Sequence, residues 1–516
     1  MFPLLLGALL LVAQVTPSGD APATVNQQQA TAPRGGPSLD LGYNDWGLSL
    51  GNSPRWNGLR LNWRDDEIES INGVNVTVWA PGDVAGSNVT GLGLGIWGPG
   101  AGELNGVHLG LIATQAETEF NGLGLALVAN KSGGDSNGIR LAGFANVSDQ
   151  DSTGIEASLI ANVSGGESNG VRLAGIANVS DYSTSGIAGA LIANTSDENI
   201  EGIQLSGIGN YAGGDMTGIQ FTGVGNWATG DMTGVHLAGI ANACDGDMTG
   251  VHAALVAASA SGEQQGVQLS GVATLCQEDM TGISAGGFAV VSQGEMRGVQ
   301  LGGLAVVGHE GMTGLNLGGL AAVSMGDMKG LNVGGLAAVC ADGEMAGFNL
   351  GGLVAFANGD MTGINVGGLS ASATGKLRGI NLSLLTVVSG MDEANDDVTG
   401  NFWGEVRDGG ITGLSAALYR IQARDHTGIS TALIMNRAQN FQGLSLGAYN
   451  GFSGSQRGLS LGIFNYAERL EGVQIGLLNY APRNPVWARW LPLVNAHFSW
   501  ASDAGPGVAP AAGGAE

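Results

Sequence analysis

Glycine recurs along most of this chain at a fixed interval of sixteen residues. The uninterrupted run comprises Gly106, Gly122, Gly138, Gly154, Gly170, Gly186, Gly202, Gly218, Gly234, Gly250, Gly266, Gly282, Gly298, Gly314 and Gly330, followed after seventeen residues by Gly347, Gly363 and Gly379. Looser units occur at Gly58, Gly73 and Gly91, and units of thirteen to fifteen residues at Gly400, Gly413, Gly428, Gly443, Gly458 and Gly472. The roughly 27 units indicate a repeat protein in which each unit stacks on its neighbours.

Each unit has the pattern of two short β-strands separated by turns. Residues 218–233 read Gly-Ile-Gln-Phe-Thr-Gly-Val-Gly-Asn-Trp-Ala-Thr-Gly-Asp-Met-Thr, in which apolar and polar residues alternate before a Gly-Asp turn. Alternation with a period of two is typical of strands. The first residue after the glycine is almost always Val, Ile or Leu. We expect the polar residue beside it to face solvent, a site held by Gln220, His236, Gln268, Asn316 and Asn332.

Two columns of identical residues favour a parallel stack. The first is Asn130, Asn146, Asn162, Asn178, Asn194, Asn210, Asn226 and Asn242; the second is Met216, Met232, Met248, Met280, Met296, Met312 and Met328. In a parallel stack each column lies above itself at about 4.7–4.9 Å, so Asn can form an amide ladder and Met an apolar rib. The sequence therefore predicts an all-β, parallel β-solenoid with coils of about sixteen residues and capped ends, on the order of 130 Å long. An outer-membrane β-barrel is the alternative fold.

The repeat also divides the chain into segments. We assign 1–21 to a signal peptide, because an apolar run is followed by small and polar residues. Residues 22–57 are a flexible leader and N-terminal cap, 58–390 the sixteen-residue solenoid and 391–399 an acidic interruption. Residues 400–484 hold the shorter repeats, 485–500 an aromatic C-terminal cap, and 501–516 a disordered tail. The expected location is extracellular, at the cell surface or in the outer membrane.

A column of small residues predicts a tight core. Ten residues after the glycine stand Ser132, Ser148, Ser164, Ser180, Ser196, Ala212, Ala228, Cys244, Ala260, Cys276, Ser292, Gly308, Ser324 and Cys340. All three cysteines of the chain lie in this column, as small buried residues. Cys244 and Cys276 are two units apart, about 9–10 Å, which exceeds disulfide reach. We expect three free, unreactive thiols.

Charge and motifs argue against several classes of function. The net charge of −25 repels nucleic acid and anionic membranes. Recognisable catalytic spacings and phosphate-binding loops are missing, so we predict no enzymatic activity and no catalytic or cofactor-binding residues. His236 and His252 share a column in adjacent units and could bind a metal, although an ordinary polar column is the preferred interpretation.

An acidic column precedes each new unit. It consists of Asp215, Asp231, Asp247, Glu263, Asp279, Glu295, Asp327 and Asp360. Stacked carboxylates repel one another, and a hard cation with oxygen ligands would relieve that repulsion. Asp215, Asp231, Asp247 and Asp279 are therefore calcium candidates. A solvated acidic ridge without any metal is the preferred interpretation, because each unit offers a single such carboxylate.

Three segments carry a family resemblance: Gly-Val-Gln-Ile-Gly-Leu-Leu-Asn-Tyr-Ala at 472–481, Gly-Leu-Ser-Leu-Gly-Ile-Phe-Asn-Tyr-Ala at 458–467, and Asn-Gly-Val-Asn-Val-Thr-Val-Trp at 72–79. They resemble units of the surface-repeat proteins of Gram-negative bacteria, which implies a secreted or surface location and no particular activity. In the central units Asn-Tyr is mostly replaced by Asn-Val-Ser or Ala-Val.

The expected function is a secreted or cell-surface structural or adhesive scaffold. An outer-membrane barrel protein and a polysaccharide-binding or polysaccharide-cleaving solenoid are the alternatives. Cell-surface glycans and other envelope proteins are the partner classes that this location brings within reach, and nucleic acid is not expected as a partner.

Overall fold

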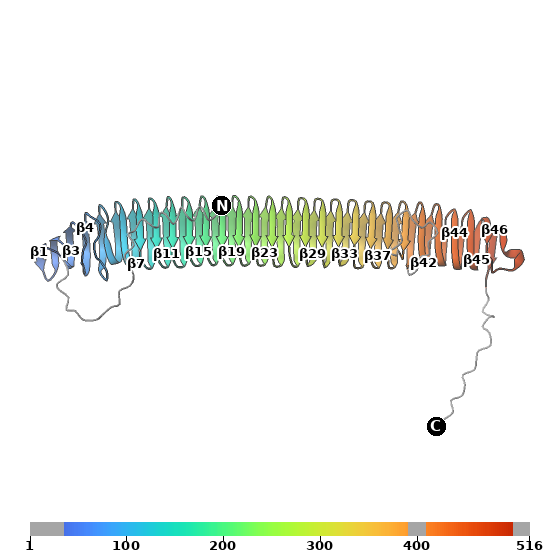
Figure 1. Cartoon of the computed structure of the whole chain (residues 1–516), viewed down its shortest axis with the longest axis horizontal. Coiled ribbons are helices and arrows are strands. Elements are labelled where there is room, and N and C mark those ends of the chain that lie inside the picture. The colour runs from blue at the N-terminus through green and yellow to red at the C-terminus, as the bar shows by residue number, and fades with distance from the viewer. Residues whose placement is uncertain (1–35, 391–408, 499–516) are drawn as a thin grey trace, which may run out of the picture.

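The computed structural model describes residues 36–390 and 409–498, which form one long parallel β-solenoid (Figure 1). About 25 coils of roughly sixteen residues follow one another, and 71% of the chain is strand. The predicted fold class is confirmed. Because equivalent strands of successive coils pair in parallel, the barrel alternative, which needs antiparallel neighbours, is wrong. The segments assigned above to 1–21, 391–399 and 501–516 lie outside the described residues.

Each central coil contains one long and one short strand. Ten long strands of seven residues, from β9 (Ser136–Ala142) to β27 (Met280–Gly286), carry odd numbers and start sixteen residues apart. Fourteen short strands of four residues, from β8 (Ala129–Ser132) to β34 (Ala337–Cys340), carry even numbers and follow the same interval. The other central strands are β29 (Glu295–Gly302), β31 (Gly311–Gly318), β33 (Asp327–Gly334), β35 (Met345–Gly351), β36 (Val354–Ala357), β37 (Met361–Gly367), β38 (Ser370–Ala373), β39 (Leu377–Ser383) and β40 (Thr386–Ser389).

The strands near the two ends are less regular in length, from six residues in β1 to seventeen in β45. The N-terminal ones are β1 (Ser38–Tyr43), β2 (Trp46–Gly51), β3 (Arg55–Asn62), β4 (Ser70–Thr77), β5 (Asn88–Gly95), β6 (Gly100–Gly110) and β7 (Ala113–Ala126). The C-terminal ones are β41 (Gly410–Ala417), β42 (Arg420–Ala432), β43 (Met435–Leu446), β44 (Tyr449–Leu461), β45 (Phe464–Tyr480) and β46 (Trp490–His497), with a 3-10 helix η1 (Val486–Ala488) before the last strand.

Successive coils are stacked in register. In β19 (Met216–Thr222) and β21 (Met232–Ala238), each residue pairs with the residue sixteen positions later, so that Met216 lies beside Met232 and Gln220 beside His236. The short strands β20 (Gly225–Ala228) and β22 (Ala241–Cys244) pair in the same way. Every column of the sequence repeat is therefore a row of side chains along the rod.

The repeat glycine is required by both backbone conformation and space. Gly218 has φ +114°, in the region that side-chain-bearing residues rarely adopt. A Cβ atom at Gly218 would lie 2.3 Å from the carbonyl oxygen of Gly202 in the preceding coil. A side chain at this position would therefore collide with the backbone of the preceding coil.

Antiparallel strands stand at both ends of the parallel stack. β1 pairs antiparallel with β2, and β46 pairs antiparallel with β45. Trp490 of β46 stacks on Tyr480 of β45, with ring centroids 3.9 Å apart. A reversed strand at each end interrupts the parallel template that an open solenoid edge would offer to other chains.

The structure corrects the predicted facing of the long strand. In residues 218–233 the inward side chains are those of Gln220, Asn226, Ala228 and Met232, each at most 1% exposed. The column predicted to face solvent, Gln220, His236, Gln268, Asn316 and Asn332, is instead fully buried. Side chains alternate along a strand, so Met216 and Gln220, four residues apart, point the same way. Once methionine is inside, the polar residue must be inside as well.

Candidate functional site

The predicted asparagine column forms a hydrogen-bonded ladder inside the rod. From Asn130 to Asn242, each Nδ2 donates to the Oδ1 of the asparagine in the next coil, at 2.8–3.0 Å. Most of these amides also donate to a backbone carbonyl on the long strand of the next coil, as Asn162 does to Leu173 at 2.9 Å. The ladder therefore joins successive coils and ties the short-strand wall to the long-strand wall.

Two further asparagine ladders continue along the rod. One runs through Asn316, Asn332, Asn349, Asn365 and Asn381 with bonds of 2.8 Å; the other runs through Asn436, Asn450, Asn465 and Asn479 with bonds of 2.7–2.9 Å. The first of these lies on the long strands, in the column that sequence reasoning assigned to solvent. The amide column thus moves from one wall to the other along the rod.

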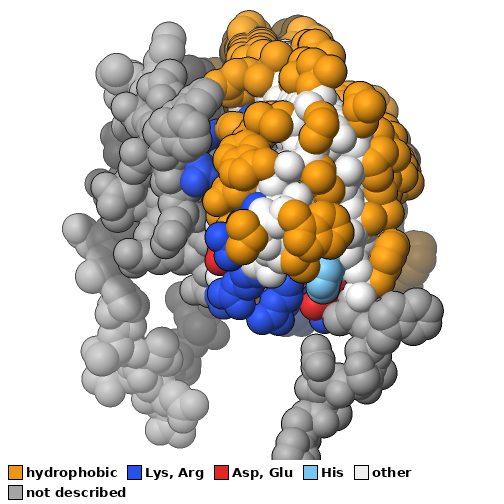
Figure 2. Space-filling model, turned by 90° about the vertical axis from the view of Figure 1, so that its right-hand side faces the viewer, with side chains coloured by type: hydrophobic (Ala, Val, Ile, Leu, Met, Phe, Trp, Pro, Cys, Tyr) orange, Lys and Arg blue, Asp and Glu red, His pale blue; other side chains and the backbone are white. Residues whose placement is uncertain are grey.

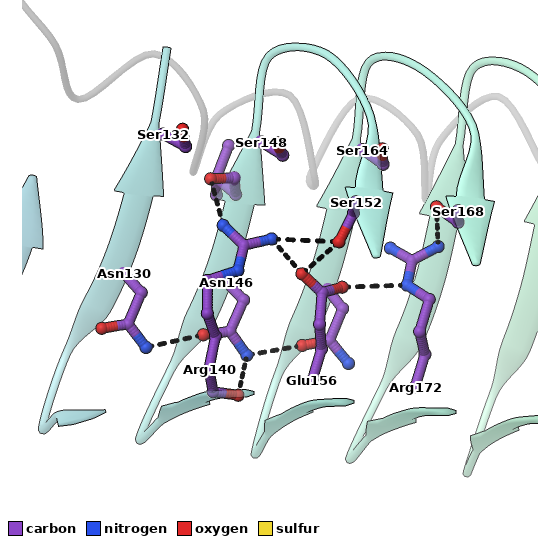
Figure 3. Close-up of polar contacts among 12 residues, drawn as sticks. Asn130, Ser132, Arg140, Asn146, Ser148, Ser152, Glu156, Ser164, Ser168 and Arg172 are labelled. Atoms are coloured by element: carbon purple, nitrogen blue, oxygen red, sulfur yellow. Dashed lines mark hydrogen bonds and ion pairs between the residues drawn. The ribbon is translucent and has the colours of Figure 1, made fainter. Parts of the chain in front are cut away.

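A buried ionic triad crosses three coils of the interior (Figure 3). Arg140, Glu156 and Arg172 occupy the second position after the glycine in three consecutive coils, and each is at most 2% exposed. Glu156 accepts from Arg140 Nη2 through Oε1 and from Arg172 Nε through Oε2, the latter at 3.1 Å. Ser152 Oγ donates to Oε1 of the same carboxylate at 2.5 Å. Sequence reasoning did not single out this triad.

The remaining guanidinium donors of the triad are bound by the coil itself. Arg140 Nη1 and Arg172 Nη2 each donate to a backbone carbonyl at 3.0 Å, and Arg172 Nη1 donates to Ser168 Oγ at 2.7 Å. Burial raises the pKa of Glu156, but the charges of Arg140 and Arg172 outweigh this effect and hold the pKa below its usual value. The carboxylate is therefore ionised between the two guanidinium groups.

The histidines of the interior are neutral. His236 and His252 lie in the same inward column as the triad and stack with ring centroids 4.8 Å apart. Burial lowers the pKa of His236 to about 4 and that of His252 to about 3, with a further contribution at His252 from His236. The prediction that His236 and His252 face solvent is therefore wrong. Within residues 36–390 and 409–498, no group of three or more His, Cys, Asp or Glu side chains is arranged to hold a metal ion.

The acidic column forms an outer ladder at the turns. Oδ1 of Asp215 accepts from the backbone N–H of Asp231 at 2.9 Å, and Asp231 and Asp247 accept in the same way from the following coil at 2.8 Å. Asn199 makes the equivalent bond to the N–H of Asp215, also at 2.8 Å. The position thus uses a side-chain oxygen as a backbone acceptor whether or not that side chain is charged. This geometry explains the column of Asp215, Asp231, Asp247 and Asp279 without calcium.

The three cysteines are free and buried. Burial raises the pKa of Cys244 to about 12 and the pKa values of Cys276 and Cys340 to about 11. At neutral pH all three are thiols rather than thiolates, which are the reactive form. These residues fill space in the small column and offer no nucleophile.

Comparisons with protein families, curated proteins and solved structures find no match to this chain. Its site must therefore be identified from its own surface and interior. Among the described residues, no helix is long and apolar enough to cross a membrane.

The outer surface of the long strands is apolar. The first and third residues after each glycine point outward and form two columns; in the coil that begins at Gly218 they are Ile219 and Phe221, 38% and 41% exposed. We call these two columns the long-strand face. The turn after the long strand adds exposed apolar residues such as Ile208 and Val224. Seen along the rod, apolar side chains cover one edge and a flank, while charged side chains gather at the opposite edge (Figure 2).

The structure thus contains two candidate features, of different kinds. The interior columns of amides, ions and histidines are sealed from solvent and act on the rod itself. The long-strand face is open to solvent and extends along the whole stack. It is the candidate functional site. Its apolar columns were identified from the sequence, but the polar column beside them, rather than these residues, was expected to face solvent.

Proposed function

We propose that this protein is an exported structural or adhesive rod that acts at the cell surface or outside the cell. The observation that carries the proposal is the unbroken parallel stack of about 25 coils. At about 4.8 Å per coil this stack is on the order of 120 Å long. Such a shape suits a spacer or a filament element that holds other components apart.

The interior supports a stiff rod. Asparagine ladders connect consecutive coils over residues 130–242, 316–381 and 436–479, and the glycine column allows close backbone contact between coils. Each coil contacts only its neighbours, so adding or removing whole coils changes length without changing cross-section. Rod length is then the property that the repeat number encodes.

Export is proposed from the sequence. The apolar start of the chain followed by small and polar residues is typical of a secretory signal, and the resemblance to surface-repeat proteins points the same way. Cell-surface glycans and envelope proteins are the partner classes that this location supplies. Fractionation of the native cells tests the location, and recovery of the protein in the cytoplasm contradicts it.

Small-angle scattering tests the rod, and a register-preserving deletion tests the coupling of coil number to length. Removing residues 282–313 deletes two coils and joins Thr281 to Gly314, which keeps the Met-Thr-Gly junction. We expect a folded rod shortened by about 10 Å. As a matched control, removal of residues 282–305 deletes one and a half coils and should disrupt the stack. A compact globular scattering profile for the whole chain contradicts the proposed rod.

A further inference from the structure

The long-strand face is continuous and uncharged over the described stack. Its first column runs through Val107, Leu123, Ile139, Ile155, Val171, Ile187, Ile203, Ile219, Val235, Val251, Val267, Ile283, Val299, Leu315, Leu331, Phe348, Ile364 and Ile380. Its second column is mostly Leu, with Phe221, Val333, Val366 and smaller Ala and Gly residues between. In the coils that the structure describes, neither column contains Asp, Glu, Lys or Arg.

We propose that a second copy of this chain packs on the long-strand face, so that two rods lie side by side with their apolar columns in contact. The inference concerns assembly and holds whether or not the rod is exported. The first observation that supports this pairing is the area of the long-strand face. The face is about 120 Å long and about 10 Å wide, so two copies would bury roughly 2,400 Å² in total, more than the roughly 1,600 Å² of a standard stable interface.

The size of the patch also sets this protein apart from an ordinary soluble monomer. The largest apolar patch on a typical monomer covers about 300–600 Å². Ile203, Leu205 and Ile219, in neighbouring coils, are already 37%, 46% and 38% exposed, and the same pattern recurs along the rod. Burying these side chains against another apolar surface is the largest stabilisation the outer surface can gain.

The surroundings of the face fit a protein interface. The residues just before the repeat glycines are mostly polar, as at Thr217 and Thr233, and form a rim along one side of the face. The acidic ladder lies at the turns, outside the face, so pairing would desolvate none of its carboxylates. An apolar centre with a polar rim is the usual anatomy of an interface between protein chains.

A second copy is a better fit than a lipid surface. The columns repeat at the strand spacing over the whole rod, and another solenoid of this sequence presents rows with the same spacing and length. A surface that lies on membranes usually carries Lys and Arg beside its apolar residues. Here the chain has 19 Lys and Arg against 44 Asp and Glu, which repels anionic lipids.

Sedimentation velocity of the full chain at micromolar concentration tests the proposal. We expect a species of about 104 kDa, twice the 51.8 kDa of one chain. A variant with Leu173→Glu, Leu205→Glu and Leu269→Glu places three charges on the face at side chains that are 42–48% exposed. The neighbouring coils hold Gly189 and Ala253 in this column, so the fold does not need leucine there. We expect the dissociation constant to rise about a hundredfold or more, because paired faces would bury the added charges.

The control variant carries Ser261→Glu, Gln277→Glu and Gln293→Glu, which add the same charge at the acidic turns, away from the face. We expect it to remain paired, and circular dichroism should show all three proteins equally folded. A monomeric wild-type chain overturns the proposal, as does pairing that survives the three face substitutions. Flotation of monomeric wild-type protein with phosphatidylcholine vesicles also overturns it and makes lipid the occupant.

Discussion

Two stretches of the rod share one backbone and have opposite interiors. In residues 136–196, which we call the polar segment, the inward side chains are mainly Ser, Asn, Arg and Glu. In residues 280–367, which we call the methionine segment, they are mainly Met, Ala and Val together with a single amide column. No buried apolar cluster includes a residue between Phe120 and Ile200, a stretch that is fully described.

The comparison shows how a narrow coil balances volume across its interior. Where the second residue after the glycine is long and charged, as at Arg140 or Arg172, the residue four positions earlier is Ser136 or Ser168. Where the second residue is Asn316, the residue four positions earlier is Met312. In each of these three coils one inward side chain of the pair is long and the other is short, whereas a coil such as the one with Met232 and His236 buries two large side chains. Hydrogen bonds and ion pairs stabilise the polar segment, and burial of apolar side chains stabilises the methionine segment.

The largest expected effect comes from removing the shared carboxylate of the polar segment. Glu156→Gln leaves Arg140 and Arg172 buried without a counter-charge, which we expect to cost about 3–5 kcal/mol locally. Hydrogen exchange of the backbone amides in β9 to β16 (Ala193–Ser196) measures the local opening free energy. Glu201→Gln, at an exposed carboxylate in the same part of the rod, is the matched control and should leave exchange unchanged.

Replacing the inward residues of the polar segment by those of another coil tests whether the ionic triad is needed for the fold. A sixfold variant with Ser136→Met, Arg140→Gln, Ser152→Met, Glu156→Gln, Ser168→Met and Arg172→Gln copies the pair Met216 and Gln220 into three polar coils. Replacing buried ions by packed apolar groups of similar volume is often neutral or stabilising. We expect wild-type protection or better in β9 to β16. Loss of the fold would show that the ionic triad is needed for more than filling its space.

The reverse change tests the methionine segment. Met312→Ser introduces the residue that the polar segment uses, without a long neighbour to fill the space. We expect a cost of about 2–4 kcal/mol from the cavity, seen as faster exchange in β29 to β33. Met325→Ser, at a methionine 39% exposed, is the control and should have little effect. Equal exchange in the two variants would contradict the volume argument.

Acid should separate the coils that contain His236 and His252, which lie between the two segments, from the polar segment. Because the folded pKa values of His236 and His252 are about 4 and about 3, the unfolded chain binds more protons below pH 6.5. Stability around β21 and β23 (Met248–Ala254) therefore falls as pH drops from 6.5, by on the order of 2 kcal/mol per histidine at pH 4.5. The lowered pKa of Glu156 makes its contribution constant above about pH 4.5 and lost only below that value.

Hydrogen exchange corrected for intrinsic rates at pH 7 and pH 5 measures this difference. The variant His236→Gln with His252→Gln carries the residue found at Gln220 and Gln268 in adjoining coils. It should flatten the pH dependence of β21 and β23 while leaving the polar segment unchanged. A pH dependence that persists in this variant would place the titrating group elsewhere.

The smallest effect is expected at the outer turns, where the two segments are alike. Asp151 accepts from the N–H of Glu167 and Asp279 from the N–H of Glu295, both at 2.8 Å. Asp151→Ala and Asp279→Ala should each cost about 1 kcal/mol, while the Asn variants keep the acceptor and should cost less. Chemical denaturation followed by local exchange compares the two sites. Clearly unequal costs would show that the interior of a coil changes how much its turn hydrogen bond contributes to stability.

The sequence repeat was enough to predict most of the architecture. A glycine every sixteen residues, an asparagine column and a methionine column were enough to predict parallel, in-register coils, because identical residues align only when equivalent strands run parallel. The small column predicted the buried cysteines for the same reason. The sequence also allowed the prediction that Met216 and Gln220 lie on the same side of the strand, because strand residues four apart point the same way.

Tertiary structure decided which side of the long strand became the inside. The expectation that polar residues such as Gln220 and His236 face water assumes that only apolar side chains point into the coil. In the parallel stack, however, inward polar groups can bond to their own copies in the next coil, as Asn316 does to Asn332, so a polar column can be buried beside the methionine column. The apolar columns were left outside, where only another surface can cover them.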